Sequence, residues 1–399
     1  MSFTSLHWGA YRPQVVDGKL MAMVPVEWDT DPSPIGDSIA EAITSPTRIL
    51  RPSVRRSYLA QMGAFPGAGN EELRGQEPFV EVSWDVALEL VAKELRRVKA
   101  EHGNKAIFGG SYGWGSAGRF HHAQSQLHRF LNSFGGYVFS TDSYSLGAGR
   151  VLMPHIVGNM DWLLAAHTSW KNLAEHCELF VAFGGLPAKN AQTSPGGASD
   201  HLLADALDKM SAAGVQFVNI SPLRDDLVGP QHNEWLPVRP GSDTALMMAL
   251  CHVLISENLH NEAFIQRYTV GYERFRDYLL GRVDGQPKDP QWAETLTDIP
   301  AGHISELARR MASKRTMINI AYSLQRSVHG EQPFWMTVTL AALLGQIGLP
   351  GGGFGLGYGC MNNTGSGRKS FSGPRFSQGV NPVKDFIPVA RVTDMLLNP

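Results

Sequence analysis

Short apolar runs alternate with helix-like segments from residue 178 onward. The runs at 178–183 and 215–220 flank a predicted helix over 198–213, and a further run lies at 317–321. Apolar strands that are separated by helices are typical of a parallel sheet covered on both faces. The pattern therefore predicts an α/β fold with mostly parallel sheets.

Each of these predicted strands ends in glycine or polar residues. Gly184-Gly185 follow the first run, Ser221-Pro222 follow the second, and the segment 322–326 follows the third. In parallel sheets, ligands bind beyond the carboxyl ends of the strands. We therefore expect a large nucleotide-like ligand that several strand-end loops hold together.

The amino-terminal segment has a different pattern. Residues 1–57 read as short strands and turns, in which Asp17-Gly18 is the expected turn of a hairpin. The segment Asp29–Pro46 is rich in Asp, Pro and Ser, which predicts a loop. From Ser83, a residue type that caps helices, the pattern changes to alternating helix and strand. These changes predict a small amino-terminal β-rich domain at 1–57, an α/β domain split between 58–150 and 331–399, and a second α/β domain inserted at 151–330.

Composition and charge exclude several classes of partner. The 399 residues carry a net charge of −2, so the chain lacks the basic surface that nucleic acids or anionic membranes require. Apolar runs such as Val338–Leu344 are far shorter than a membrane span. Met1–Pro13 lacks the pattern of an export leader. This predicts a cytoplasmic protein, or a periplasmic one if a leader precedes this sequence.

The cysteines indicate which metal centres to expect. Cys177, Cys251 and Cys360 lie far apart and form no Cys-x-x-Cys pair. This spacing offers no ligand set for zinc or an iron–sulfur cluster, and it suits a reducing compartment. We therefore expect no iron–sulfur cluster.

Two Gly-rich loops in the first half of the chain place hydroxyl and aromatic side chains where a cofactor can bind. The first contains S-Y-G-W at 111–114, the second contains Y-S-L-G at 144–147, and M-P-H-I-V-G follows at 153–158. Together these segments resemble the DMSO reductase family of molybdopterin enzymes. The biotin sulfoxide and trimethylamine N-oxide reductases are the branch that the chain resembles most.

The resemblance implies that Ser145 is the molybdenum ligand. Without the flanking motifs, a serine at this place is more often a helix cap. In the family, the residues that match Tyr112 and Trp114 face the oxygen on the metal, where a phenol or an indole N–H can donate a hydrogen bond. Such a donor stabilises charge on the oxygen while the S–O or N–O bond breaks. The alternative is that both aromatic side chains pack on the core. If Tyr112 is instead catalytic, its presence favours S-oxides over N-oxides as substrates.

The resemblance also implies which residues bind the guanine nucleotide of the cofactor. Asp243 matches a carboxylate that can accept hydrogen bonds from guanine, and Arg326 matches a guanidinium that can bind diphosphate. The alternatives are a helix N-cap for Asp243 and a surface charge for Arg326. The expected cofactor-binding residues are Trp114, Gly184, Gly185, Leu186, Ser221, Pro222, Ser242, Asp243, Tyr322, Ser323, Gln325 and Arg326.

Several positions depart from the family pattern. Ser143 and Ser221 stand where relatives have aspartate, and Leu186 replaces an aspartate in a turn. Arg150 replaces a glutamine that usually follows the serine loop. These departures indicate a divergent branch of the family.

The resemblance implies a molybdenum oxidoreductase that carries bis(molybdopterin guanine dinucleotide) and reduces S-oxides or N-oxides by oxygen-atom transfer. Its partners would be the small-molecule oxide and an external electron donor. Family members are roughly twice as long, so we expect an incomplete chain whose carboxyl-terminal domain follows it or comes from a separate chain. The alternatives are a non-catalytic cofactor-binding remnant, a subunit that needs a partner chain, and a nucleotide-dependent dehydrogenase. The lack of a G-x-G-x-x-G helix start disfavours the last.

Overall fold

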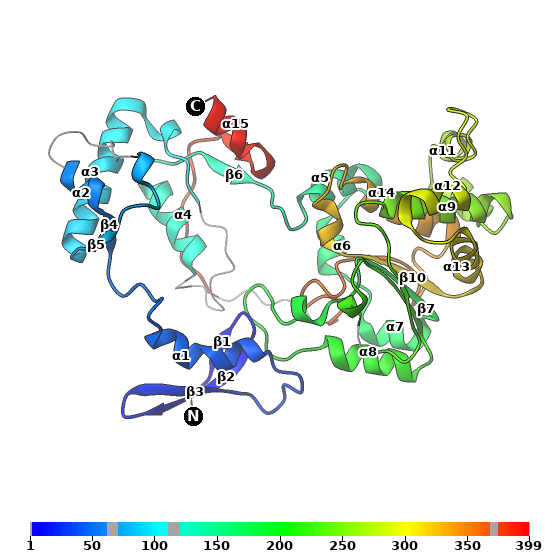
Figure 1. Cartoon of the computed structure of the whole chain (residues 1–399), viewed down its shortest axis with the longest axis horizontal. Coiled ribbons are helices and arrows are strands. Elements are labelled where there is room, and N and C mark those ends of the chain that lie inside the picture. The colour runs from blue at the N-terminus through cyan, green and yellow to red at the C-terminus, as the bar shows by residue number, and fades with distance from the viewer. Residues whose placement is uncertain are drawn as a thin grey trace.

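A computed structural model of the chain describes residues 2–61, 71–110, 120, 122–227, 229–367 and 374–398. In Figure 1 the described chain forms three parts: a small amino-terminal sheet, a group of helices and short strands on the left, and a larger α/β part on the right. We call the second part the helical region (the described residues of 53–141 and 374–398). We call the third part the sheet region (the described residues of 147–367).

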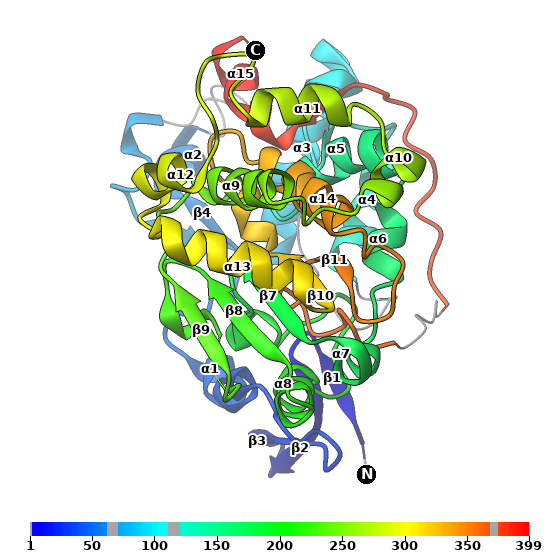
Figure 2. The same cartoon turned by 90° about the vertical axis from the view of Figure 1, so that its right-hand side faces the viewer.

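A parallel sheet forms the centre of the sheet region. Its strands, all within the described residues, are β7 Leu179–Phe183, β8 Gln216–Ile220, β9 Asn233–Leu236, β10 Thr316–Ile320 and β11 Gly353–Leu356. They pair in parallel in the order β11-β10-β7-β8-β9, and we call them the large sheet (Figure 2). β7 and β10 are buried along their whole length. The predicted fold class, a mixed α/β chain with parallel sheets, is confirmed.

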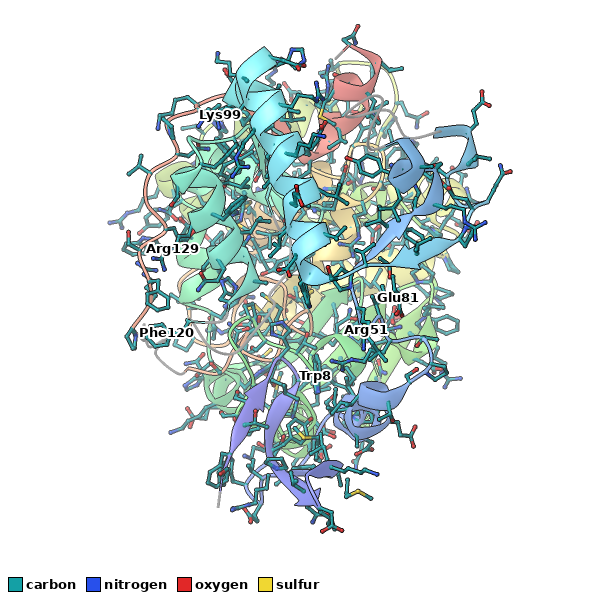
Figure 3. The ribbon with its side chains drawn as sticks, turned by 90° about the vertical axis from the view of Figure 1, so that its left-hand side faces the viewer. Trp8, Arg51, Glu81, Lys99, Phe120 and Arg129 are labelled. Atoms are coloured by element: carbon teal, nitrogen blue, oxygen red, sulfur yellow. The ribbon has the colours of Figure 1, made fainter. Side chains whose placement is uncertain are left out.

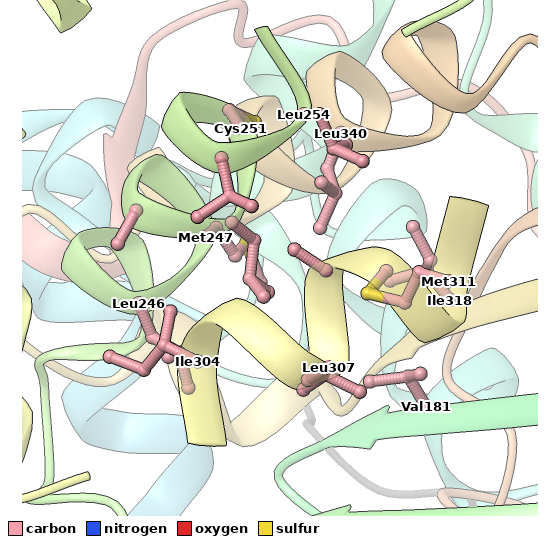
Figure 4. Close-up of a cluster of buried hydrophobic side chains, with 14 of the residues drawn as sticks. Val181, Leu246, Met247, Cys251, Leu254, Ile304, Leu307, Met311, Ile318 and Leu340 are labelled. Atoms are coloured by element: carbon pink, nitrogen blue, oxygen red, sulfur yellow. The ribbon is translucent and has the colours of Figure 1, made fainter. Parts of the chain in front are cut away.

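Helices cover both faces of the large sheet. One face carries α7 Trp170–His176 and α8 Leu203–Ala212, and the other carries α9 Asp243–Ser256, α13 Ala301–Ser313 and α14 Gln332–Leu344. Successive side chains of β7 point to opposite faces. Val181 therefore packs in the cluster with α9, α13 and α14, whereas Phe180 packs with α7 and α8. Figure 4 shows Val181 and Leu307 in the first of these clusters.

Shorter helices surround this layered core. They are α5 Gly147–Val157, α6 Asp161–Ala165, α10 Glu262–Tyr268, α11 Tyr272–Leu279 and α12 Pro290–Thr297. α5 and α10 pack on α14, α11 and α12 pack on α9, and α6 packs beside β11. Among the described residues, no helix is both long and apolar enough to cross a lipid bilayer.

The amino-terminal sheet confirms the predicted hairpin. Its antiparallel strands are β1 Thr4–Leu6, β2 Gly9–Val16 and β3 Lys19–Pro25. Asp17 and Gly18 have φ of 49° and 75°, the left-handed pair that a two-residue hairpin turn requires. The sheet is joined to the sheet region by a buried contact, in which Asp29 Oδ2 lies 2.8 Å from His201 Nδ1.

The prediction of a loop over Asp29–Pro46 is wrong for residues 34–44, which are helical. A 3-10 helix covers Pro34–Ser38, and α1 covers Ile39–Thr44. The Ser33 hydroxyl accepts a hydrogen bond from Ile35 N at 3.4 Å, and proline suits the first position of a helix. The alanines and the glutamate of α1 are good helix formers, so the local preference outweighs the loop-like composition.

The helical region consists of short elements. They are α2 Arg56–Gln61, α3 Trp84–His102, α4 Ala123–Ser133, α15 Val392–Leu397, β4 Ser53–Arg55, β5 Phe79–Glu81, β6 Phe139–Thr141 and β12 Phe386–Pro388. β4 pairs with β5 in antiparallel and β6 with β12 in parallel. The Ser83 hydroxyl accepts from Val86 N at 3.3 Å, which confirms the predicted cap of α3. Figure 3 shows Lys99 on α3 and Arg129 on α4; Lys99 Nζ donates to Phe134 O at 2.6 Å, which connects the two helices.

The strand pairing shows which elements the residues of the predicted segment 331–399 contact. The sequence placed 331–399 together with 58–150, yet β11 pairs with β10 and α14 packs on α9. Only the later part of the segment, through β12, pairs with the helical region. The physical reason is that α14 and β11 bury their apolar side chains against the large sheet. The domain boundaries stay predictions.

Candidate functional site

The loops that follow β7, β8 and β10 meet closely at the carboxyl edge of the large sheet. Gly184 and Gly185, directly after β7, have φ of +83° and +72°, which glycine adopts without strain. A Cβ at Gly184 would lie 2.6 Å from Ala321 Cβ, after β10, and a Cβ at Gly185 would lie 2.5 Å from Asp226 Cβ, after β8. The two glycines therefore allow these loops to approach each other.

The next residues on these loops have different environments. Leu186 is 1% exposed and packs in the core with α7 and α8, and its N–H donates to Asp226 O at 2.6 Å. The Ser221 hydroxyl donates to Asp226 Oδ2 at 2.6 Å and accepts from Leu223 N at 3.2 Å. Pro222 is exposed. The structure thus brings Gly185, Leu186 and Ser221 around Asp226, which the sequence did not single out.

A 3-10 turn at Tyr322–Gln325 follows β10. Tyr322 is 5% exposed, its hydroxyl donates to Leu356 O at 3.4 Å, and burial raises the pKa of its phenol. Ser323 and Arg326 are exposed on the same turn. The turn therefore presents a serine and a guanidinium beyond a buried tyrosine.

This turn is bonded to the loop that carries Ser145. Gln325 Oε1 accepts from Ala148 N at 2.9 Å, while Gln325 Nε2 and Arg326 Nη1 donate to Tyr144 O at 2.5 and 3.2 Å. Ser145 is half-buried in the loop between β6 and α5. The loop that carries the predicted metal ligand is thus bonded, through Tyr144 and Ala148, to two predicted cofactor-binding residues.

Ser145 also lies where the two regions of the molecule meet. The hydroxyl of Tyr144 donates to Val389 O, after β12, while its carbonyl accepts from the turn after β10. Leu146, rather than Ser145, occupies the N-cap position of α5. Ser145 thus directly precedes the N-cap residue of α5, and its role as a metal ligand stays a prediction.

Asp243 is a buried carboxylate at the start of α9. It is 3% exposed, and within the described part of the chain its Oδ1 has no hydrogen-bond partner. Burial raises the pKa of Asp243 to about 6. Ser242 occupies the N-cap position, and its hydroxyl donates to Arg239 O at 2.7 Å. Asp243 is thus the first helical residue rather than the cap, and it is suited to accept a hydrogen bond from a ligand.

Asp243 and Ser242 line a large cavity. Its volume is about 2110 Å³, and α5, α9, α10, α11 and α14 contribute to its walls. Tyr268, Tyr272 and Trp335 are among the aromatic residues that line it. The cavity exceeds the roughly 300–1,000 Å³ of typical small-molecule pockets, so a nucleotide can enter it.

The predicted residues Tyr112 and Trp114 lie outside the described residues. Gly109, two residues before the segment that carries them, donates its N–H to Val138 O at 3.0 Å. Val138 directly precedes β6, the strand that leads to the Ser145 loop.

Two family models match the chain. The model for the molybdopterin oxidoreductase domain matches residues 48–390, and the model for the molybdopterin oxidoreductase N-terminal domain matches residues 4–43. The chain belongs to the molybdopterin oxidoreductase family. The relatives described next confirm the resemblance to its DMSO reductase branch.

Several relatives are named as S-oxide or N-oxide reductases. A biotin sulfoxide reductase of Cereibacter sphaeroides is 43% identical and is matched over 95% of this chain and 50% of its own length. A dimethyl sulfoxide/trimethylamine N-oxide reductase of Rhodobacter capsulatus is 41% identical over 98% of this chain and 48% of its own length. A trimethylamine-N-oxide reductase of Haemophilus influenzae is 37% identical, and the match covers 99% of this chain and 49% of that protein. The chain thus spans about half the length of these relatives.

A solved structure has a similar fold. It is the acetylene hydratase from Pelobacter acetylenicus, with a TM-score of 0.51 and 19% sequence identity. The match covers 87% of this chain and 44% of that protein. At this identity the similarity concerns the fold alone.

Proposed function

We propose that this chain is the amino-terminal half of a molybdenum oxidoreductase that carries bis(molybdopterin guanine dinucleotide) and reduces S-oxides or N-oxides by oxygen-atom transfer. The observation that supports this most is the junction at Tyr144. There the loop of Ser145, the proposed metal ligand, is bonded to Gln325 and Arg326 of the proposed nucleotide site. A reaction on the metal requires this relative placement of metal ligand and cofactor.

The described residues fit the nucleotide end of such a cofactor. The unpaired Oδ1 of Asp243 can accept from guanine N1–H or its amino group. Gly184 and Gly185 allow the loops after β7, β8 and β10 to approach each other closely, so the proposed contacts of these loops lie at one edge of the large sheet. The exposed guanidinium of Arg326 can pair with diphosphate. Ser221, Pro222, Leu186, Tyr322 and Ser323 complete the proposed strand-end site.

The bound cofactor would supply the redox chemistry, which takes the oxygen atom from the oxide and releases it as water with two electrons and two protons, the electrons coming from an external donor. The protein would supply Ser145 as an oxygen ligand. Tyr112 and Trp114 are proposed to donate hydrogen bonds to the substrate oxygen, which stabilises the charge that develops there. We expect the protein to work without an iron–sulfur cluster.

A further part of the protein is proposed to cover the helical region. On α3, Trp84, Leu88 and Val91 recur with helical spacing and are 69%, 60% and 57% exposed. An apolar stripe of this kind usually packs against another element. We propose that the half of the relatives that this chain does not match, as a continuation or as a partner chain, packs there. Alone, the chain is then expected to be nearly inactive; a non-catalytic cofactor-binding remnant is the alternative.

The test uses the chain joined to the carboxyl-terminal half of the 43% identical biotin sulfoxide reductase. Produced in a host that makes the cofactor, the fusion is expected to contain molybdenum and to reduce biotin sulfoxide or trimethylamine N-oxide with reduced viologen. Replacement of Ser145 by Ala is expected to lower turnover at least 100-fold and to change the spectrum of the metal, because alanine offers no oxygen ligand. Ser143→Ala, in the same loop, is the matched control.

A fusion that takes up no molybdenum would contradict the proposed function. Unchanged turnover and an unchanged metal spectrum in the Ser145→Ala variant would contradict the metal ligand alone. Turnover by the isolated chain at the rate of the fusion would show that no second half is needed.

A further inference from the structure

The side chain of Gln325 bridges the two sides of Ser145. Its Oε1 accepts from Ala148 N at 2.9 Å, and its Nε2 donates to Tyr144 O at 2.5 Å. A backbone N–H can only donate and a backbone carbonyl can only accept, so these two contacts fix which end of the amide faces which residue. One side chain therefore holds the residue before Ser145 and the residue three positions after it.

The contact with Ala148 supplies a cap that the sequence next to α5 does not provide. The first amides of a helix have no partner within the helix, and a polar N-cap side chain usually accepts from the second or third of them. The N-cap residue of α5 is Leu146, whose apolar side chain makes no such bond, and Ala148 is the second residue of the helix. Gln325, 177 positions away in the sequence, takes the place of the missing cap.

Local sequence fixes the loop between β6 and α5 only weakly. Asp142 has φ of 62°, which is uncommon for a residue with a side chain, and Tyr144 is 61% exposed. Gly147 and Gly149, in the first turn of α5, weaken the start of the helix. Contacts with other parts of the chain therefore contribute to the shape of this loop.

The turn that carries Gln325 is itself well anchored. It follows β10, which is buried along its whole length, and the neighbouring side chain of Leu324 packs against two of the buried clusters. Arg326 donates from its backbone N–H to Ser323 O at 3.0 Å, which closes the turn around Gln325. A Cβ at Gly330 would lie 2.0 Å from Gln325 O, so this glycine lets the following chain pack against the turn. The bridge thus connects the loop to the buried centre of the large sheet.

A metal ligand has to be held within about 0.5 Å of its productive position, and supporting residues provide this. We propose that Gln325 is a positioning residue, which sets the place of Ser145 through the backbone on both sides of it. The proposal rests on the proposed role of Ser145 as the metal ligand. It gives Gln325 this role in place of the contact with the cofactor that the resemblance implies.

The first test measures the bridge in the purified chain, without cofactor. Hydrogen exchange reports the protection of the Ala148 amide in the unaltered chain and in its variants. Gln325→Leu removes the acceptor and is expected to speed this exchange roughly five- to tenfold, the size of effect that one lost hydrogen bond has. Gln325→Glu keeps an acceptor and is expected to retain the protection. Gln266→Leu, the same change at an exposed position of α10, is the control.

The second test measures the metal in the fusion with the carboxyl-terminal half of the biotin sulfoxide reductase. Gln325→Leu is expected to take up molybdenum as the unaltered fusion does and to change the spectrum of the metal. It should lower turnover roughly tenfold or more with little change in KM, because a small misplacement at the reacting centre is costly. Gln325→Glu, which loses the donor to Tyr144 O, is expected to change the spectrum as well and serves if Gln325→Leu fails to fold. Gln266→Leu should leave spectrum and turnover unchanged.

An Ala148 amide that exchanges at the same rate in Gln325→Leu as in the unaltered chain would overturn the assignment. So would an unchanged metal spectrum in both Gln325 variants of the fusion. Loss of molybdenum from these variants alone would show that Gln325 binds the cofactor, which also overturns it. An unaltered fusion without molybdenum would contradict the proposed function, whereas the exchange measurement still decides whether Gln325 holds the loop.

Discussion

The sheet region and the helical region are held together in different ways. Among the described residues, the large buried clusters lie in the sheet region, where Phe180 and Val181 of β7 are both 0% exposed. In the helical region, the described residues of the buried cluster are Ile107, Leu131 and Tyr137, with partly buried side chains around them. Among the described residues, the sheet region therefore has a large hydrophobic core, whereas the helical region has a small one.

Polar contacts supply part of what the helical region lacks in apolar burial. Asn381 Nδ2 donates to Tyr137 O at 2.9 Å, and Asn381 Oδ1 accepts from Tyr137 N at 3.2 Å. Asn132 Nδ2 donates to Gln378 O at 2.9 Å. The pairs β4–β5 and β6–β12 are two-stranded, and such pairs are marginal in water. The two regions should therefore differ in stability and in response to mutation.

The largest expected effect is the loss of a core side chain in the sheet region. The ring of Phe180 lies 5.9 Å from the Phe217 ring and 5.8 Å from the Tyr358 ring. Phe180→Ala should lower the free energy of unfolding by about 3–5 kcal/mol, because it removes buried area and leaves a cavity. Leu131→Ala, in the helical region, should cost about 2 kcal/mol, since its small cluster can collapse.

Urea unfolding followed by circular dichroism measures both losses, and hydrogen exchange shows which region opens. Equal losses for the two variants, with one common transition, would contradict the distinction between the regions.

A second expected effect is a pH dependence of the free energy of unfolding that arises from Asp243 in the sheet region. Burial raises the pKa of Asp243 to about 6 in the folded chain, whereas the unfolded carboxyl titrates near 4. The folded chain thus binds this proton more tightly, so the stabilisation is complete below about pH 4 and is lost as the pH rises through about 6. The free energy of unfolding should fall by up to about 3 kcal/mol over this window from this group.

Asp243→Asn should remove this part of the pH dependence, while Asp225→Asn, at an exposed position, should keep it. The measurement is urea unfolding at several values between pH 4 and pH 7. The same slope in the unaltered chain and in Asp243→Asn would mean that Asp243 is not the titrating group.

The sequence predicted the centre of the large sheet better than its edges. β7, β8 and β10 are apolar runs, and their parallel pairing follows from the helices between them. β9 and β11, with the sequences N-E-W-L and G-F-G-L, carry no apolar run. They are strands because the open edges of β8 and β10 offer them backbone hydrogen bonds, which local sequence does not encode.

The candidate site was predictable where a strand ends in a recognisable turn, as at Gly184 and Gly185. Asp226 was missed because its approach to Ser221 depends on the turn that Asn219 fixes. The contact of Tyr144 with Val389 joins residues 245 positions apart, so only the assembled fold reveals it. Contacts of this kind decide which predicted residues face a common ligand.

The smallest expected effect on stability concerns the exposed face of α3. Trp84 and Leu88 are 69% and 60% exposed, so the double change to serine should alter the free energy of unfolding by no more than about 1 kcal/mol. Its effect on association should be larger, because the change removes the centre of an apolar stripe. Val270→Ser is the control, since Val270 is 99% exposed in the sheet region and lies apart from α3.

Sedimentation velocity at increasing concentration measures this association. The unaltered chain and Val270→Ser should associate, and the Trp84 and Leu88 double variant should remain closer to a monomer. A monomeric unaltered chain would show that the apolar stripe of α3 does not drive association. Unfolding of the double variant would show that Trp84 and Leu88 stabilise α3 through contacts within this chain. Either result would remove the main structural reason for expecting a second half to pack on the helical region.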